Sequence, residues 1–199
     1  MIAIIDVSGN NLTSLVNAVQ GLGFNYKLTH DEQEIQAATH VILPGVGAAS
    51  YGMNALREHG LDEVLPELTQ PILGICLGMQ LLLEHSEEGD VECLGLIPGT
   101  AKLITRTEHH PVPHMGWNQL KWCQNSPLQY GLDDQEFVYF VHSYALKESQ
   151  YTLASCDYKD NFSAIINKNN IFGMQFHPEK SADTGMTLLN NFLSLEALC

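Results

Sequence analysis

The chain has 199 residues, of which 45% are hydrophobic and 16% are charged. This composition excludes an intrinsically disordered chain and is sufficient for one domain over residues 1–199. The chain carries 23 Asp and Glu against 9 Lys and Arg, a formal net charge of −14, which argues against binding to nucleic acids or anionic membranes, because both require cationic side chains.

The first residues and the cysteines indicate a cytoplasmic protein. The start, M-I-A-I-I-D-V, lacks the basic segment of a signal peptide, and Asp6 interrupts its apolar run early. The apolar runs further on are shorter than the roughly 20 residues that a membrane-spanning helix needs. The cysteines are odd in number and form no C-x-x-C pair, as expected for reduced thiols. They are Cys76, Cys93, Cys123, Cys156 and Cys199.

Strand-like and helix-like segments alternate over the first 85 residues. Short apolar runs predict strands at 2–7, 24–28, 41–43 and 71–76. Helical periodicity between them, in one case after the capping residue Asp31, predicts helices at 12–19, 31–38, 51–68 and 77–84. Such alternation is typical of a parallel sheet covered by helices.

The second half has a different organisation, with predicted strands that follow one another directly. These strands are expected at 102–107, 137–141, 151–155, 162–166 and 171–176, and a closing helix is expected at 184–195. The predicted fold class is therefore α/β, with a mostly parallel central sheet flanked by helices and antiparallel additions in the second half.

The segment G-I-C-L-G at 74–78 follows an apolar strand and precedes a helical pattern. This is the layout of a nucleophile elbow, in which the nucleophile stands on a tight strand-to-helix turn between small residues. The N–H groups that begin the helix favour a thiolate at Cys76, and the N–H of Leu77 is placed to stabilise an oxyanion. The alternative is a buried structural cysteine between turn glycines.

A cysteine nucleophile needs a base, and the base needs an orienting group. His177 ends the apolar strand I-F-G-M-Q-F, and Glu179, two residues on, would lie on the same side of an extended chain. The carboxylate of Glu179 can then hold one ring nitrogen while the other faces Cys76. The alternative is a His-Pro turn with an exposed glutamate.

The remaining histidines lack such a setting. His109, His110 and His114 fall in a Pro-containing loop without paired cysteines or H-x-x-x-H spacing, so neither a metal site nor a cofactor is predicted. Four others lie near the ends of predicted helices and are expected at the surface: His30, His40, His59 and His85.

The segment L-P-G-V-G at 43–47 ends another predicted strand. In a parallel sheet it shares the carboxyl edge with the elbow, where α/β proteins bind ligands. The backbone N–H groups of Gly45, Val46 and Gly47 are therefore candidates for a second oxyanion donor, since glycine lets a backbone approach a ligand closely. A structural Pro-Gly turn is the alternative.

Five segments stand out together. They are L-P-G-V-G at 43–47, G-I-C-L-G-M-Q at 74–80, P-H-M-G-W-N at 113–118, Y-F-V-H-S-Y at 139–144 and F-H-P-E-K-S at 176–181. In this order they resemble the class-I, triad-type glutamine amidotransferases, and more narrowly the glutaminase subunits of imidazole glycerol phosphate synthases. The resemblance covers nearly the whole chain and implies a flavodoxin-like sheet. One departure is V-S-G-N-N-L at 7–12, where the family often has Y-G-x-G-N-L.

The resemblance implies a Cys-His-Glu triad. Cys76 would attack the side-chain amide of glutamine, His177 would transfer the protons, and Glu179 would hold His177. The N–H groups of Leu77 and of the loop at 45–47 would stabilise the oxyanion. Four residues would hold the substrate glutamine: Gln80, His142, Ser143 and Tyr144.

The resemblance also implies a heterodimer with a (β/α)₈-barrel cyclase. That partner would use the ammonia to make imidazole glycerol phosphate and aminoimidazole carboxamide ribotide in histidine biosynthesis. The chain alone is expected to hydrolyse glutamine poorly and to be activated by the partner with its nucleotide. Candidate interface residues are Asn11, Trp117, Tyr139 and Lys180, although Trp117 and Tyr139 also fit a hydrophobic core.

Four alternatives remain open from the sequence. One is a class-I amidotransferase subunit of a different synthase, against which P-H-M-G-W-N and V-H-S-Y argue. Another is a paralogue with the same chemistry that serves a sugar-modifying enzyme. The third is a non-enzymatic or redox-active cysteine protein, against which the intact set Cys76, His177 and Glu179 argues. The fourth is a pure binding module, which gives no reason for that set.

Overall fold

The computed structural model describes residues 1–6 and 12–196. Within them, eight strands form the central sheet, in the order β2 (Tyr26–Thr29), β1 (Ile2–Ile5), β3 (His40–Gly45), β4 (Ile72–Cys76), β14 (Ile171–Met174), β13 (Asp160–Lys168), β12 (Thr152–Tyr158) and β9 (Lys121–Trp122). The first five run parallel, and the last three join them antiparallel. This confirms the predicted α/β class with a mixed sheet.

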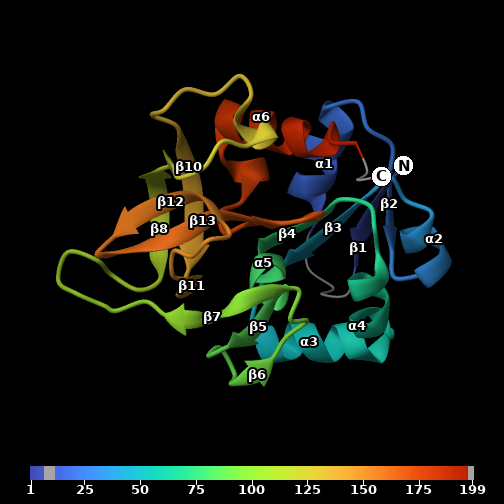
Figure 1. Cartoon of the computed structure of the whole chain (residues 1–199), viewed down its shortest axis with the longest axis horizontal. Helices are drawn as coiled ribbons and strands as arrows, with labels where there is room; N and C mark the ends of the chain where they lie inside the picture. The colour runs from blue at the N-terminus through green and yellow to red at the C-terminus, as the bar shows by residue number, and fades with distance from the viewer. Residues whose placement is uncertain (7–11, 197–199) are drawn as a thin grey trace.

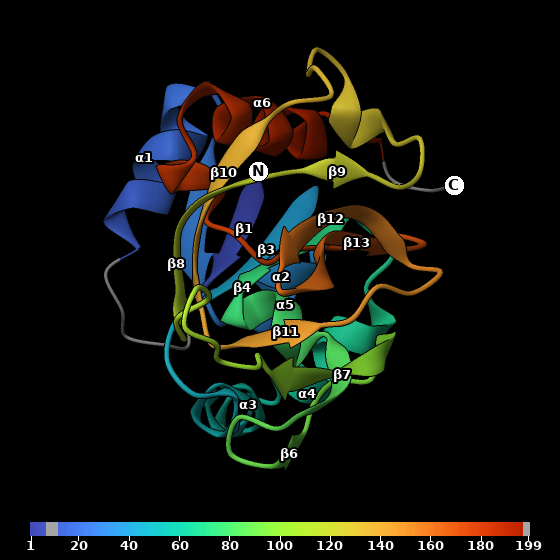
Figure 2. The same ribbon diagram turned by 90° about the vertical axis from the view of Figure 1, so that its left-hand side faces the viewer.

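Helices cover both faces of the sheet (Figures 1 and 2). One face carries α1 (Thr13–Gly21) and α6 (Ala182–Leu193), and the other carries α3 (Ala49–Glu58), α4 (Leu61–Val64) and α5 (Leu77–Leu81). The alternation of strand side chains explains the two layers. In β1, Ile2 and Ile4 belong to the core under α1 and α6, whereas Ala3 and Ile5 belong to the core on the opposite face.

Two smaller sheets extend this framework. Strand β10 (Phe137–His142) pairs antiparallel with β8 (His114–Gln119). The second consists of β11 (Tyr144–Leu146), β7 (Ile97–Leu103), β5 (Leu83–Ser86) and β6 (Val91–Glu92). The short turns η1 (Leu65–Glu67), η2 (Pro127–Gln129) and η3 (Pro178–Lys180) complete the elements.

The pairing of β3, β4 and β14 positions the candidate site. Gly45 at the end of β3 lies opposite Cys76 at the end of β4, and Met174 at the end of β14 lies opposite Ile75. The carboxyl ends of these adjacent parallel strands therefore meet at one edge of the sheet, where ligands of α/β proteins bind. His177 follows β14 by three residues and reaches the same edge.

The structure corrects several predicted bounds. The helix expected at 51–68 is interrupted at Gly60, whose φ of 67° is left-handed and ends α3. The helix expected at 77–84 stops at Leu81, because the next apolar residues form β5. The strand expected at 102–107 lies earlier, as β7, and its partner β5 was missed.

Two histidines are not where the sequence suggested. His40, expected at the surface, is buried in β3 and its Nε2 lies 3.0 Å from the carbonyl oxygen of Leu195. His114, expected in a loop, is buried at the start of β8. Neither position could be found from hydropathy, because a polar side chain is buried only where it meets partners from distant segments.

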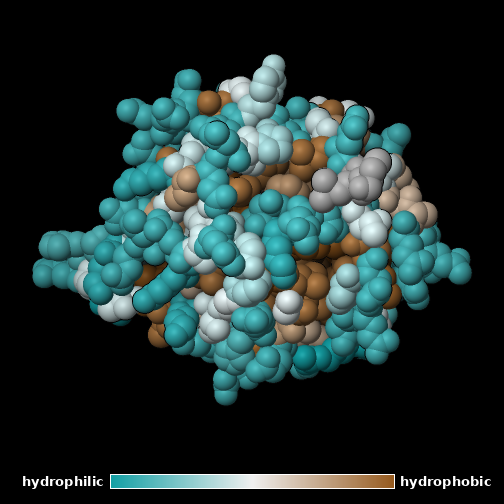
Figure 3. Space-filling model, in the orientation of Figure 1, coloured by the Kyte–Doolittle hydropathy of each residue, from teal (hydrophilic) through white to brown (hydrophobic). Residues whose placement is uncertain are grey.

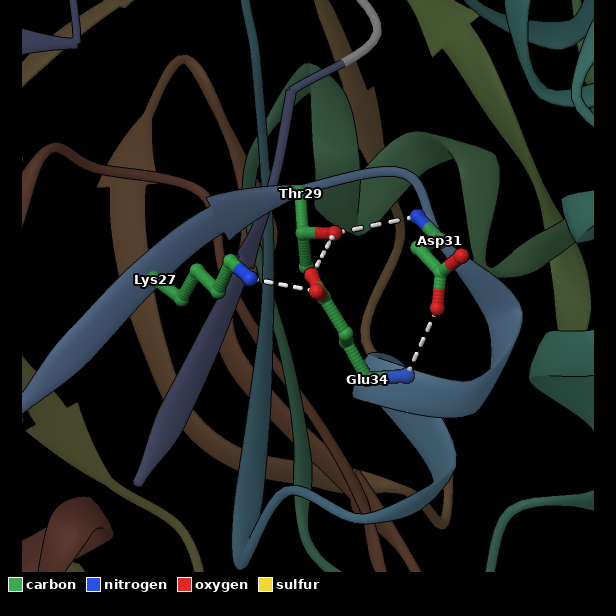
Figure 4. A network of polar contacts seen from close by, with 4 residues as sticks. All are labelled: Lys27, Thr29, Asp31 and Glu34. Atoms are coloured by element: carbon green, nitrogen blue, oxygen red, sulfur yellow. Dashed lines mark hydrogen bonds and ion pairs between the residues drawn. The ribbon is translucent and has the colours of Figure 1, made fainter.

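The start of α2 (Glu32–Gln36) shows the expected capping (Figure 4). The carboxylate of Asp31 accepts a hydrogen bond of 3.0 Å from the N–H of Glu34. The carboxylate of Glu34 in turn pairs with Lys27 and accepts from the hydroxyl of Thr29. These contacts tie the helix to β2, and the hydrogen bonds to Lys27 and Thr29 lower the pKa of Glu34.

The surface drawn in Figure 3 is mostly hydrophilic, and hydrophobic residues show mainly in recesses of its middle. Among the helices formed by the described residues, none combines the length and the apolar character needed to cross a membrane.

Candidate active site

Cys76 stands on a strained turn between β4 and α5. Its φ of 54° and ψ of −109° are unusual for a residue with a side chain. Such strain is typical of positions that present a functional group, and costs about 1–3 kcal/mol. The flanking glycines make the turn possible. A Cβ atom at Gly78 would come within 1.8 Å of the carbonyl oxygen of Leu43, and one at Gly74 within 2.6 Å of the Gly78 backbone.

The elbow holds the Cys76 side chain at the wall of a cavity. Cys76 is only 7% exposed, and its Sγ lies 3.9 Å from the carbonyl oxygen of Val141. The N–H of Leu77 begins α5 and so has no acceptor within the helix. Because α5 is only five residues long, its first N–H groups, rather than a long helix dipole, are what can stabilise negative charge at Cys76.

His177 and Glu179 meet beside Cys76, as the sequence indicated. His177 Nδ1 lies 3.0 Å from Glu179 Oε1, and their side chains are 5% and 8% exposed. The backbone differs from the expectation, since Glu179 sits in the turn η3 and not in an extended segment. A carboxylate only accepts, so Nδ1 carries the proton. Nε2 is buried with no ordinary hydrogen-bond partner among the described residues, and the Cys76 thiol is its neighbour.

The surroundings of His177 favour its protonated form. Burial is the largest single effect and by itself lowers the pKa of the imidazole. The interactions with Cys76 and Glu179 together outweigh it and raise the pKa of His177 to about 9. A histidine with a raised pKa beside a cysteine is the arrangement that activates a cysteine nucleophile.

Ser181 holds the backbone of His177, the candidate base, and the sequence did not single it out for this purpose. Its side chain is fully buried, its hydroxyl donates to the carbonyl oxygen of His177 at 2.7 Å, and it accepts from the N–H of Tyr139 at 2.9 Å. The N–H of His177 also donates to the carbonyl oxygen of Tyr139 at 3.2 Å. The position of His177 is therefore tied to strand β10.

A cavity of about 540 Å³ opens onto Cys76 and His177. The predicted residues that line it are Val46, Gly47, Leu77, Gln80, His142, Ser143 and Tyr144. Gln80 is 4% exposed, and its Oε1 accepts from the Ser86 hydroxyl at 3.4 Å. The predicted nucleophile, base and substrate residues thus share one space.

Glu88 also lines this cavity, although nothing in the sequence singled it out. Its position in the acidic stretch S-E-E-G-D resembles an ordinary surface turn. Burial raises the pKa of its carboxyl group, while a hydrogen bond with the backbone of Ala49 acts in the opposite direction. Glu88 therefore gives this cavity a carboxylate, suited to a ligand with an ammonium group.

The loop after β3 separates this cavity from a second one of about 310 Å³. Val46 lines both, Gly47 lines the first, and Gly45 lines the second together with Glu179 and Lys180. The loop abuts the elbow, since a Cβ atom at Gly45 would lie 3.0 Å from Leu77 Cβ. Gly47 has a φ of 100°, which disfavours other residues. The candidate oxyanion donors are thus grouped around Cys76.

The interface candidates lie near this edge where the structure describes them. Trp117 and Tyr139 are opposite each other in β8 and β10, with ring centroids 6.0 Å apart. Trp117 is 54% exposed and so is not a core residue. Lys180 lines the second cavity, and Asn11 lies outside the described residues. Within 1–6 and 12–196, no cluster of three or more His, Cys, Asp or Glu suits a metal ion.

Comparison with known proteins identifies relatives over the full chain. The family model "Glutamine amidotransferase class-I" matches residues 3–195. "Imidazole glycerol phosphate synthase subunit HisH 2" of Legionella pneumophila strain Lens is 66% identical over 100% of both chains. "Imidazole glycerol phosphate synthase subunit HisH" of Idiomarina loihiensis is 50% identical over 100% of this chain and 99% of that protein.

Solved structures support the fold. One solved glutamine amidotransferase superposes with a TM-score of 0.73 at 16% identity, covering 96% of this chain and 96% of the other. A glutamine amidotransferase from Thermotoga maritima superposes with a TM-score of 0.67 at 14% identity, over 96% and 95%. At these identities the likeness concerns the fold alone.

Proposed function

This chain belongs to the class-I glutamine amidotransferases, and from that premise we propose that it is the glutaminase subunit of an imidazole glycerol phosphate synthase. It would act in the cytoplasm, in histidine biosynthesis, as one amidotransferase domain over residues 1–199. The observation that carries the proposal is the contact of His177 with Glu179 and Cys76 at the wall of one cavity. The identities of 66% and 50% to synthase subunits support the choice of synthase.

The triad would act through a thioester. The Cys76 thiolate attacks the side-chain amide carbon of glutamine, and the N–H groups of Leu77 and the 45–47 loop stabilise the oxyanion. The imidazolium of His177 gives its Nε2 proton to the amide nitrogen, the C–N bond breaks, and ammonia leaves. Neutral His177 then takes a proton from water as the water attacks the thioester. Expulsion of the thiolate gives glutamate and restores the starting pair.

The rest of the cavity would bind the amino-acid end of glutamine. Glu88 would pair with the α-ammonium group, and the backbone at 142–144, with Gln80, would hold the substrate across from Cys76. A charged hydrogen bond in such a site contributes about 1.5–3 kcal/mol. Glu88 would thereby favour free glutamine over a glutamine residue within a peptide, whose α-nitrogen is not an ammonium group.

Glu88→Gln is expected to raise KM for glutamine roughly 10- to 100-fold with little change in kcat, because only the bond to the α-ammonium group is weakened. Steady-state glutamate release measures both constants. Glu87→Gln is the matched control, since Glu87 is exposed and lies outside the cavity. Equal KM values for both variants would remove Glu88 from the substrate site.

The ammonia would pass to a (β/α)₈-barrel cyclase bound at the carboxyl edge of the sheet. Exposed Trp117, its neighbour Tyr139 and Lys180 lie around this edge and are our candidates for the contact. We include Asn11 from the sequence alone. The partner would turn its nucleotide and the ammonia into imidazole glycerol phosphate and aminoimidazole carboxamide ribotide.

Glutamate release by the purified chain tests the proposal, measured alone and with the cyclase of the same organism plus its nucleotide. Turnover that increases strongly with the liganded cyclase is the expected result. Turnover that depends on Cys76 but does not respond to the cyclase would keep the glutaminase and assign a different acceptor enzyme. Absence of glutamate release under every condition would overturn the function.

A further inference from the structure

Two buried histidines face each other beside the active-site cavity. His114 and His142 are directly opposite in the pair β8–β10, and they are 3% and 5% exposed. His114 Nδ1 lies 3.0 Å from His142 Nε2, and His142 Nδ1 lies 2.8 Å from the carbonyl oxygen of Tyr144. Both ring nitrogens of His142 are therefore engaged within the protein, and its ring has none left for a substrate.

The contact with Tyr144 fixes the direction of both hydrogen bonds. A carbonyl oxygen only accepts, so His142 Nδ1 carries a proton. Burial is the main cause that lowers the pKa of His142 to about 3, so the ring is neutral and its Nε2 accepts. The donor to that nitrogen must be Nδ1–H of His114. Burial also lowers the pKa of His114 to about 4, so its own Nε2 has no proton.

Aromatic rings hold His114 in the plane that this hydrogen bond needs. Its ring stacks on Tyr158 at 3.8 Å between centroids and on Phe140 at 4.9 Å, with interplanar angles of 23° and 20°. The Tyr158 hydroxyl is itself anchored, since it donates to the carbonyl oxygen of Pro111 at 2.6 Å. Packing on the faces of the His114 ring thus holds its Nδ1–H toward His142 on the neighbouring strand.

The chain of bonds ends on the segment that lines the cavity. His142 Nδ1 donates to the carbonyl oxygen of Tyr144, two residues further along the chain, and this hydrogen bond closes the bend between β10 and β11. All three residues line the cavity, and the preceding Val141 carbonyl is 3.9 Å from Cys76 Sγ. The carbonyl of Ser143 is held separately by the N–H of Ile104 at 2.9 Å.

We propose that His114 is a positioning residue for glutamine: its Nδ1–H directs His142, and His142 holds the 142–144 bend in the shape that binds the substrate. This inference rests on the proposed glutaminase function. His114 does not line the cavity, so it can act on glutamine only through the residues that it contacts, and His142 is the one that lines the cavity. Loss of the donor loosens the bend and weakens glutamine binding, while the attack by Cys76 on bound glutamine is retained.

Two variants without a ring separate the hydrogen bond from the stacking. In His114→Asn the amide nitrogen stands as many bonds from Cα as Nδ1 does, so the donor is kept. In His114→Gln the amide nitrogen is one bond further, and the donor is misplaced. Both lose the stacking on Phe140 and Tyr158. A third variant, His114→Phe, keeps a stacked ring and removes the donor.

Glutamine KM and kcat are measured for each variant in complex with the cyclase and its nucleotide, with Tm as the measure of folding. We expect KM within about 2-fold of the unmodified protein for His114→Asn, and about 10-fold higher for His114→Gln and His114→Phe, with kcat retained. Equal KM values for the Asn and Gln variants, or KM values that simply follow Tm, would overturn the positioning role.

Nitrogen-15 spectra of the unmodified protein test the bond directions without any assay. The expected pattern has the proton on Nδ1 and a bare Nε2 in both His114 and His142. A proton on Nε2 of His114 would overturn the inference even if glutamine is hydrolysed. If the expected tautomers appear but the protein releases no glutamate, the proposed function fails and the substrate role of His114 fails with it.

Discussion

Replacing Cys76 with serine is expected to lower kcat for glutamine hydrolysis at least about 10⁴-fold. The hydroxyl is nearly isosteric with the thiol and fits the same strained turn, but it does not ionise near neutral pH. His177 then faces a hydroxyl group in place of the thiol. Since the interaction with Cys76 is one of the two that raise the pKa of His177, that pKa should fall below about 9.

The matched control for this substitution is Cys93→Ser. Cys93 is only partly buried, but burial raises the pKa of its thiol to about 11, and it lies outside both cavities of the candidate site. Glutamate release, glutamine binding by calorimetry and NMR titration of His177 should all be unchanged in the control. For Cys76→Ser, glutamine binding should persist while turnover disappears. Full turnover by this variant would exclude Cys76 as the nucleophile.

An electrophilic glutamine analogue distinguishes an enzyme from a redox-active cysteine protein. The triad should direct alkylation to Cys76, because its sulfur faces His177 in the cavity that would bind glutamine. Cys156 is fully buried, and burial strongly raises the pKa of its thiol, so it should stay unlabelled. Mass spectrometry of the labelled chain reads out both positions.

The positions of the elbow and of the candidate base His177 could be predicted because their constraints are local. A strand that ends in G-I-C-L-G must turn sharply, and the contact of a Cβ atom at Gly78 with Leu43, at 1.8 Å, shows why glycine is needed. His177 followed by Pro178 and Glu179 keeps both partners within one turn. Parallel pairing then brings β3, β4 and β14 to the same edge.

The supporting contacts could not be predicted, because they join segments that are distant in sequence. Ser181 contacts both His177 and Tyr139, and Tyr139 lies 42 residues before Ser181. The hydrogen bond between His114 and His142 joins residues 28 positions apart. Glu88 belongs to the cavity only because β5 follows α5 directly, where the periodicity suggested a longer helix. A short apolar run fits either element by pattern alone, and tertiary packing decides.

Replacing Glu179 with glutamine is expected to lower kcat about 10³-fold. An amide can turn its NH₂ group toward His177 Nδ1, which must then act as the acceptor. The proton of the neutral ring moves to Nε2, and Nε2 can no longer accept the thiol proton. In the other orientation, the NH₂ group takes the place of Oε2, which is buried without a hydrogen-bond partner among the described residues. In neither orientation of the amide is His177 held as favourably as by the carboxylate of Glu179.

The same substitution should shift the pH dependence in a defined direction. Glu179 is one of the interactions that raise the pKa of His177 to about 9, so its neutralisation lowers that pKa. Because the protonated His177 that delivers a proton to the leaving amide is lost as pH rises through its pKa, the alkaline limb of kcat/KM should move to lower pH. Glu179→Asp is the control: it keeps the charge but shortens the side chain, and should lose less activity with a smaller shift. A Gln variant as active as the Asp variant, with an unmoved alkaline limb, would mean that His177 is oriented by its backbone ties to Tyr139 and Ser181 alone.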